Sequence, residues 1–89
     1  MIYLDNAATT WPKPPAVLAA VDNGMRRLGS NPGRGGYVMS LRSSDAIYEC
    51  RKTAAGLFGA PGPECVVFTQ NCTHAINIVL KGMLKPGDH

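Results

Sequence analysis

Residues 66–77, VVFTQNCTHAIN, contain the point at which one hydrophobic pattern gives way to another. The apolar run that ends at Phe68 shows no alternation, which predicts a buried strand near residues 65–69. From about Asn71 the apolar side chains recur at helical spacing, and Asn71 itself can cap the helix. The stretch therefore predicts a strand that leads into a helix through a polar turn.

Two more helices are expected before this junction. The prolines in residues 12–15 favour the start of the first helix, and Gly29 would end it. Ser40 is the expected N-cap of the second helix, and Gly59 its end. Cys50 lies on the apolar stripe of the second helix, so we expect it in the core. The other residues of that stripe are Leu41, Ile47, Ala54, Leu57 and Phe58.

The order of these elements indicates the fold class. A strand–helix unit that ends in a turn, here KPGD at residues 85–88, usually continues into another parallel strand. One buried strand cannot make a sheet by itself. We therefore expect an α/β fold in which residues 1–89 are a single incomplete unit of a larger protein, mostly helical in this segment.

Composition narrows the function classes. The chain has 45% hydrophobic and 17% charged residues, which is typical of a globular protein. The net charge of +3 is small and the basic residues are dispersed, so a nucleic-acid partner is not expected and a small basic nucleic-acid binder is the weakest hypothesis. Three cysteines without paired spacing favour a reducing compartment, and we expect a cytoplasmic protein. No apolar run is long enough to span a bilayer, and no Cys or His spacing indicates a metal site.

The polar turn before the last helix is a candidate anion site. The backbone N–H groups of Cys72, Thr73 and His74 lie among the first, unpaired donors of that helix. The helix dipole adds about half a positive charge at this end, and Thr73 adds a hydroxyl donor. The alternative is a capped helix that binds nothing. The residues alone leave both open, because the glycines of a P-loop are missing.

The glycine-rich stretch GSNPGRGG, residues 29–36, is a second candidate region. It is either a flexible linker or a loop whose backbone approaches a ligand closely. Arg34 within it could bind a carboxylate or phosphate, or could be an ordinary exposed arginine. Asn6 and Thr9 could contact a ligand or could simply form a turn.

Four blocks of the sequence resemble, in this order and spacing, the N-terminal segment of the class V aminotransferases, and most closely the cysteine desulfurases. The blocks are LDNAATTWPKP, SNPGRGGYVMS, VVFTQNCTHAIN and LKGMLKPGDH. The resemblance covers essentially all 89 residues. It implies pyridoxal 5'-phosphate (PLP) as cofactor, a fold of type I like that of aspartate aminotransferase, a small amino-acid substrate and a homodimer. It also implies that residues 1–15 form an N-terminal arm and pocket rim, and residues 16–89 the start of the large PLP-binding domain.

The resemblance assigns cofactor-binding roles to three residues. Cys72 and Thr73 match the pair that holds the cofactor phosphate through backbone N–H groups and a hydroxyl. Relatives carry Ala or Thr where this chain has Cys72, so only the backbone contact transfers there. His74 stands where relatives usually have Glu, which leaves its role in the cofactor site open.

The resemblance also implies a substrate pocket but no catalytic residue in this chain. Asn6, Ala7 and Ala8 match a segment that lines the pocket, and Arg34 matches an arginine that in some relatives reaches the partner subunit's active site. The family's Schiff-base lysine and nucleophilic cysteine lie beyond residue 89. The four lysines here lie at a helix start, on polar helix faces or in a turn: Lys13, Lys52, Lys81 and Lys85.

The expected function follows from these matches. The chain is expected to be the N-terminal segment of a PLP enzyme, either a cysteine desulfurase that removes sulfur from L-cysteine or a related class V transferase or lyase. It is not expected to be catalytic alone. The alternative is a stand-alone anion-binding or interaction module.

Overall fold

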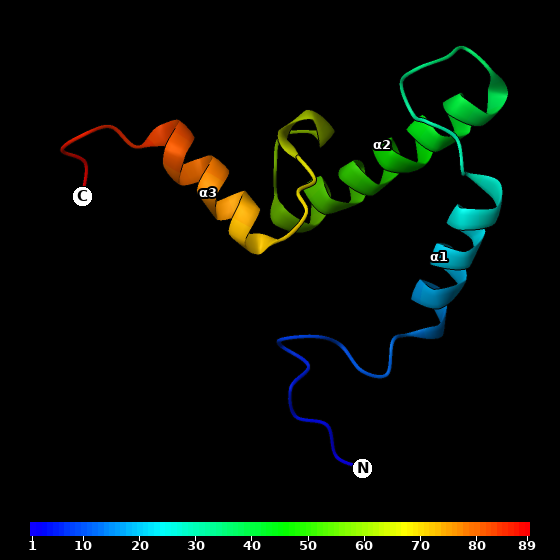
Figure 1. The fold of residues 1–89 in the computed structure, drawn as a ribbon, viewed down its shortest axis with the longest axis horizontal. Helices are drawn as coiled ribbons and strands as arrows, with labels where there is room; N and C mark the ends of the chain where they lie inside the picture. Colours follow the sequence, from blue (N-terminus) through cyan, green and yellow to red (C-terminus); the bar gives the residue numbers. More distant parts are fainter. The chain divides into compact units, whose positions relative to one another are not determined.

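The structure, a computed structural model, describes residues 1–89 and contains only helical elements (Figure 1). These are α1 (Pro15–Arg27), α2 (Val38–Phe58), the 3-10 turn η1 (Pro63–Cys65) and α3 (Cys72–Met83). The chain divides into two compact units, Met1–Glu49 and Cys50–His89, and α2 crosses the boundary between them.

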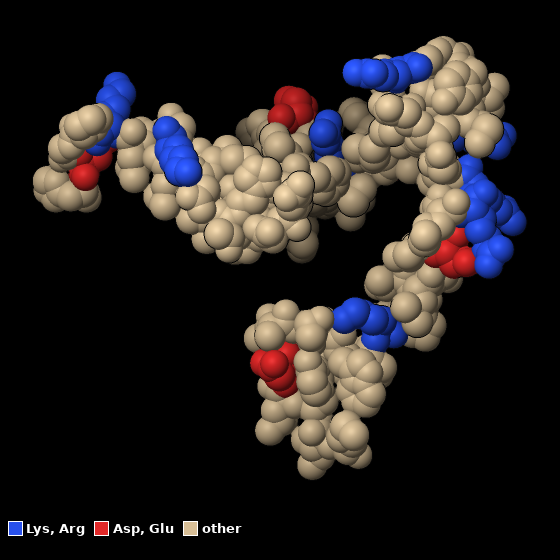
Figure 2. Space-filling model, viewed as in Figure 1, with Lys and Arg blue, Asp and Glu red and all other residues tan.

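α1 begins and ends as the sequence predicts, within two residues. Pro15 occupies the first turn, where the missing N–H costs nothing. At the other end the N–H of Leu28 donates to the carbonyl of Gly24 at 2.9 Å. An exposed ion pair joins Arg26 to Asp22 at 2.7 Å. Figure 2 shows blue and red side chains beside each other over α1.

α2 begins earlier than predicted, so the assignment of Ser40 as its N-cap is wrong. The helix starts at Val38, and the N–H of Leu41 already donates to the carbonyl of Tyr37 at 3.1 Å. Ser40 therefore lies inside the first turn, where its side chain is free to bond a distant part of the chain. Its hydroxyl donates to the carbonyl of Asn31 at 3.0 Å.

Gly59 ends α2 as predicted. Its φ of +66° lies in the left-handed region, and the N–H of Ala60 turns back to the carbonyl of Ala55 at 2.9 Å. This is the hydrogen bond of a Schellman motif, which satisfies a carbonyl that the helix itself leaves unpaired.

The predicted buried strand at residues 65–69 is absent, and this prediction is wrong. Cys65 belongs to η1, and Val66 follows with extended dihedral angles, φ −110° and ψ 121°, but without a ladder partner. Val67 is 74% exposed and Phe68 52% exposed. The local backbone is extended as the β-branched residues favour, yet a strand needs a second strand beside it, and no other segment of the chain is extended against this one.

Few side chains are buried, which overturns the expected core of α2. Ala55 is the one buried apolar residue, and Ser40 and Ser43 are the buried polar ones. Cys50, expected in the core, is exposed, as is Leu57 on the same predicted stripe. The amphipathic pattern is present in the sequence, but burial requires a partner surface that α2 does not meet here.

Candidate functional site

The turn that leads into α3 is held by Asn71. Its backbone is extended, and its side-chain Oδ1 accepts a hydrogen bond from the N–H of His74 at 2.8 Å. Its carbonyl accepts from the N–H of Ala75 at 3.1 Å and from the Thr69 hydroxyl at 3.1 Å. The predicted N-cap is therefore confirmed, and the capping residue itself is fixed by its neighbours on both sides.

This capping arrangement leaves two backbone donors for an external group. The N–H groups of Cys72 and Thr73 occupy the first turn, where an α-helix has no acceptor of its own. No acidic residue lies in this first turn to compete for them. The twelve residues of α3 place the positive end of the helix dipole at the same point. Two adjacent N–H groups, a threonine hydroxyl and a positive dipole suit a phosphate group.

The three residues expected to bind the cofactor lie together here, but they are not equivalent. The N–H of His74 is already bonded to Asn71, so only its side chain could reach a ligand. The Cys72 thiol is free and exposed. The carbonyl of Thr73 accepts from the Asn77 amide at 2.9 Å, which holds the backbone at the centre of the turn. Their binding of a cofactor stays a prediction.

The residues predicted to line a substrate pocket near the N-terminus form a closed turn. The N–H groups of Ala8 and Thr9 donate to the carbonyl of Asp5 at 3.1 and 3.3 Å. The Asn6 side chain accepts from the N–H of Trp11 at 3.0 Å and approaches the carbonyl of Tyr3 at 3.4 Å. Asn6 thus shapes the turn, and Ala7 and Ala8 lie exposed on it.

The aromatic side chains of Tyr3 and Trp11 close this turn from the side. Their ring centroids are 5.6 Å apart in an edge-to-face arrangement, and the Tyr3 hydroxyl donates to the carbonyl of Thr9 at 2.8 Å. Lys13 bonds to the Thr9 hydroxyl at 3.0 Å and to the carbonyl of Thr10. The ammonium group of Lys13 is therefore engaged locally.

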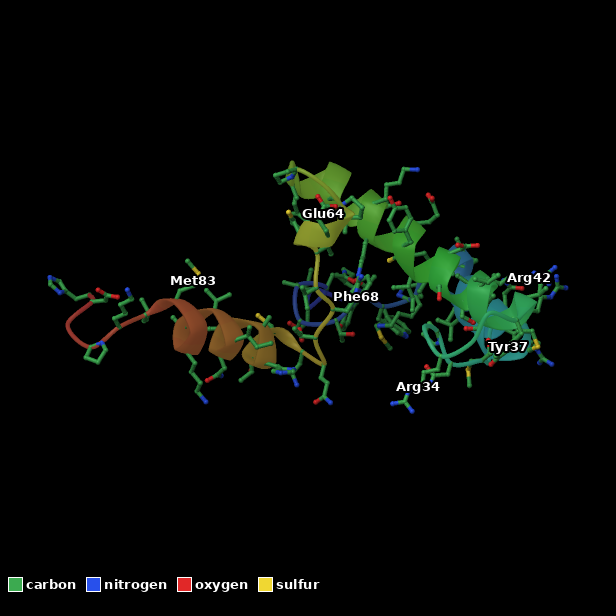
Figure 3. The ribbon with its side chains drawn as sticks, turned by 90° about the horizontal axis from the view of Figure 1, so that it is seen from above. Arg34, Tyr37, Arg42, Glu64, Phe68 and Met83 are labelled. Carbon is green, nitrogen blue, oxygen red and sulfur yellow. The ribbon has the colours of Figure 1, made fainter.

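Arg34 projects from the glycine-rich loop. Gly33 has a φ of +89°, which a residue with a side chain adopts only with strain. A Cβ at position 35 would meet the Tyr37 ring at 2.5 Å. Figure 3 shows the Arg34 side chain directed away from the ribbon. Both glycines that flank Arg34 thus have a conformational or steric reason to be glycine.

Three serines and Arg51 make contacts that the sequence did not predict. Hydrogen bonds of Ser30, Ser40 and Ser43 tie this loop to α2. The only signal in the sequence was the spacing of Ser40 and Ser43, three residues apart on one helix. Arg51 was also overlooked: its guanidinium lies 5.7 Å from the centroid of the Phe68 ring, and its Nε is buried without a hydrogen-bond partner. Nothing in the local pattern distinguished Arg51 from other helix-surface arginines.

One hollow lies on α3 itself, and its lining is apolar. It is formed by Ala75, Ile76, Val79 and Leu80, and the surface over α3 in Figure 2 is mostly tan. Met83 continues this face toward the helix end and points outward in Figure 3. No helix of the structure has the length and apolar character needed to cross a membrane.

Comparison with known proteins identifies the family. The profile of the family described as aminotransferase class-V matches residues 2–89. A probable cysteine desulfurase of Methanothermobacter thermautotrophicus is 40% identical over 98% of this chain and 22% of its own length. A probable cysteine desulfurase of Synechocystis sp. is 40% identical over 99% of this chain and 22% of its own length. Another, of Mycolicibacterium paratuberculosis, is 37% identical over 99% of this chain and 13% of its own length.

The coverage is one-sided. The chain spans between 13% and 22% of the length of these curated relatives, while nearly all of the chain is matched. No solved structure shows a significant match. Since the family profile covers the sequence from residue 2 to residue 89, this chain belongs to the class V aminotransferases.

Proposed function

We propose that this chain is the N-terminal part of a PLP-dependent cysteine desulfurase, in which α3 provides part of the cofactor's phosphate site. In this proposal residues 1–15 form an arm and pocket rim, and residues 16–89 begin the large domain of a type I fold. The complete protein would act in the cytoplasm as a homodimer that takes sulfur from L-cysteine. Membership of the class V family and relatives named probable cysteine desulfurase support this proposal.

The observation that carries the cofactor site is the capped end of α3. Asn71 uses the N–H of His74 and leaves those of Cys72 and Thr73 pointing out of the helix. A phosphate would accept hydrogen bonds from both of these and from the Thr73 hydroxyl. The bound cofactor would supply the electron-withdrawing ring of the reaction, and the residues of this chain would bind and orient it.

The proposed contacts with the substrate come from the first unit, Met1–Glu49. Arg34 would bind the carboxylate of the amino acid, since a guanidinium matches a carboxylate in charge and geometry. The turn around Asn6, Ala7 and Ala8 would line the pocket. Residues 1–89 alone would not catalyse the reaction, because none of their lysines lies in the context of a cofactor-bound lysine.

A single substitution tests the cofactor site in the complete polypeptide that carries this segment. Thr73→Val keeps the shape of the side chain and removes its hydroxyl. We expect the affinity for PLP, measured by titrating the cofactor-free protein, to fall about tenfold, the loss typical of one hydrogen bond to a charged group. The matched control is Ser44→Ala, which removes a hydroxyl from α2. An unchanged PLP affinity in Thr73→Val would contradict the proposal.

The same titration separates the alternative function. A stand-alone anion-binding module would need nothing beyond its own residues. If residues 1–89 bound PLP as tightly as the complete polypeptide, the chain would be such a module and not part of a larger cofactor site.

A further inference from the structure

We propose that Ser40 and Ser43 are positioning residues that hold the glycine-rich loop, and thereby Arg34, in place for the substrate carboxylate. This inference rests on the proposed function, in which Arg34 contacts the substrate. It adds two residues on α2 to which neither the sequence motifs nor the family comparison assigns a part in substrate binding. The three serines that take part, Ser30, Ser40 and Ser43, are called the serine clamp below.

The serine clamp joins the loop to α2 through side-chain hydrogen bonds. The Ser43 hydroxyl lies 2.9 Å from the carbonyl of Leu28 and 3.1 Å from that of Met39, one turn earlier in α2, and 3.0 Å from the Ser30 hydroxyl. The Ser40 hydroxyl donates to the carbonyl of Asn31 at 3.0 Å. Because Ser43 donates its single proton to one of these two carbonyls, Ser30 is the donor of the bond between the two hydroxyls. The clamp thus fixes residues 28, 30 and 31, immediately before Arg34.

Burial shows that these contacts are specific. Ser40 is 1% exposed and Ser43 is 5% exposed, in a chain where most side chains are open to solvent. Alanine would suit the interior of a helix better than serine does. A buried hydroxyl without a partner destabilises a structure. The Ser40 hydroxyl finds its acceptor in the loop, and the Ser43 hydroxyl finds one in the loop and one in its own helix, the carbonyl of Met39.

The chain after Arg34 returns directly to α2. A Cβ at position 35 would meet the Tyr37 ring at 2.5 Å, so the ring would have to move, and Tyr37 leads directly into α2. Arg34 therefore lies between the serine clamp and Tyr37, the residue directly before α2. Its side chain is directed away from the ribbon in Figure 3. A long flexible side chain on an anchored backbone keeps its reach while losing less freedom when it binds.

The test uses the complete polypeptide and three alanine variants. Ser40→Ala and Ser43→Ala remove the clamp hydroxyls, and Ser44→Ala is the matched control on the next position of α2. We expect amide exchange in residues 29–36 to accelerate in the first two and not in the control. KM for L-cysteine should rise about tenfold with kcat and PLP affinity unchanged, as for one misplaced charge-assisted hydrogen bond. A purely structural role would instead lower PLP affinity and thermal stability together.

A double-mutant cycle decides whether the serines act through Arg34. In an Arg34→Ala background, Ser43→Ala should cause no further rise in KM, because the group it positions is gone. An equal rise in both backgrounds, or unchanged exchange in residues 29–36, would overturn the inference while leaving the proposed function intact. If Arg34→Ala itself left KM unchanged, the role of Arg34 in the proposed function would fail, and the inference with it.

Discussion

The substitution Asn71→Asp separates an anion site from a merely capped helix, because the two interpretations predict different outcomes. Asn and Asp are equally good N-caps, and the Oδ1 atom that accepts from His74 at 2.8 Å is retained. A negative charge at a helix N-terminus is also favourable, by about 0.3–1 kcal/mol. The stability of the protein should therefore stay the same or rise slightly.

Binding of a phosphate should move in the opposite direction. A carboxylate at position 71 would lie about 6 Å from a phosphate of charge about −2, which costs roughly 1.4 kcal/mol even at the dielectric constant of water. That corresponds to about a tenfold loss of affinity. Asn71 is exposed, so screening should shrink the loss markedly as salt is raised to about 1 M, where the Debye length is near 3 Å.

The assay is a titration of the cofactor-free complete polypeptide with PLP, at low and high salt, beside a thermal melt. Asn71→Ser is the control, since serine keeps a capping oxygen and adds no charge. We expect the serine variant to bind like the parent protein and the aspartate variant to bind about tenfold more weakly at low salt only. Equal affinity of the two variants would refute the anion site, and a lower melting temperature for Asn71→Asp would refute the capping geometry.

Two further predictions concern the helix ends and the exposed thiols. Gly59→Ala should destabilise the complete polypeptide by about 1 kcal/mol, because φ is +66° there, whereas Gly56→Ala within the same helix should stabilise it by about 0.5–1 kcal/mol, since nothing lies within 4 Å of the new Cβ. Thermal melts of the two variants should therefore shift in opposite directions. A shift of both melting temperatures in the same direction would contradict the cap at Gly59. Alkylation of Cys72 should slow about tenfold when PLP is added to the cofactor-free protein, and Cys65, which is also a free exposed thiol, serves as the internal reference. Mass spectrometry of the two peptides measures both alkylation rates. Equal slowing of the two thiols would mean that the cofactor does not lie at the start of α3.

The local parts of the fold were predictable because short-range interactions produce them. The end of α2 at Gly59 and the start of α3 at Asn71 each depend on hydrogen bonds within five residues. Proline at the start of α1 acts through its own ring. Such helix ends depend only on residues close in the chain, so they can be predicted from the sequence alone.

The failed predictions share a dependence on distant partners. Val66 has the extended backbone that its residue type favours, but a strand exists only where another strand lies beside it. Cys50 has the right helical position to be buried, but its burial depends on what packs against α2. A hydrophobic pattern predicts which face of a helix should be buried, but it does not predict which segment packs against that face.

The sequence by itself determined the family, the C-terminal end of α2, the start of α3 and the position of a candidate phosphate site, since motifs and capping residues act over a few neighbours. Only the tertiary structure decided which groups the serines bond. Ser40 reads as a helix cap in sequence, yet its hydroxyl bonds a carbonyl nine residues away, and Ser43 bonds one fifteen residues away. Which carbonyl a serine meets depends on how the loop returns to the helix, and that path is set by packing and not by the serine's neighbours.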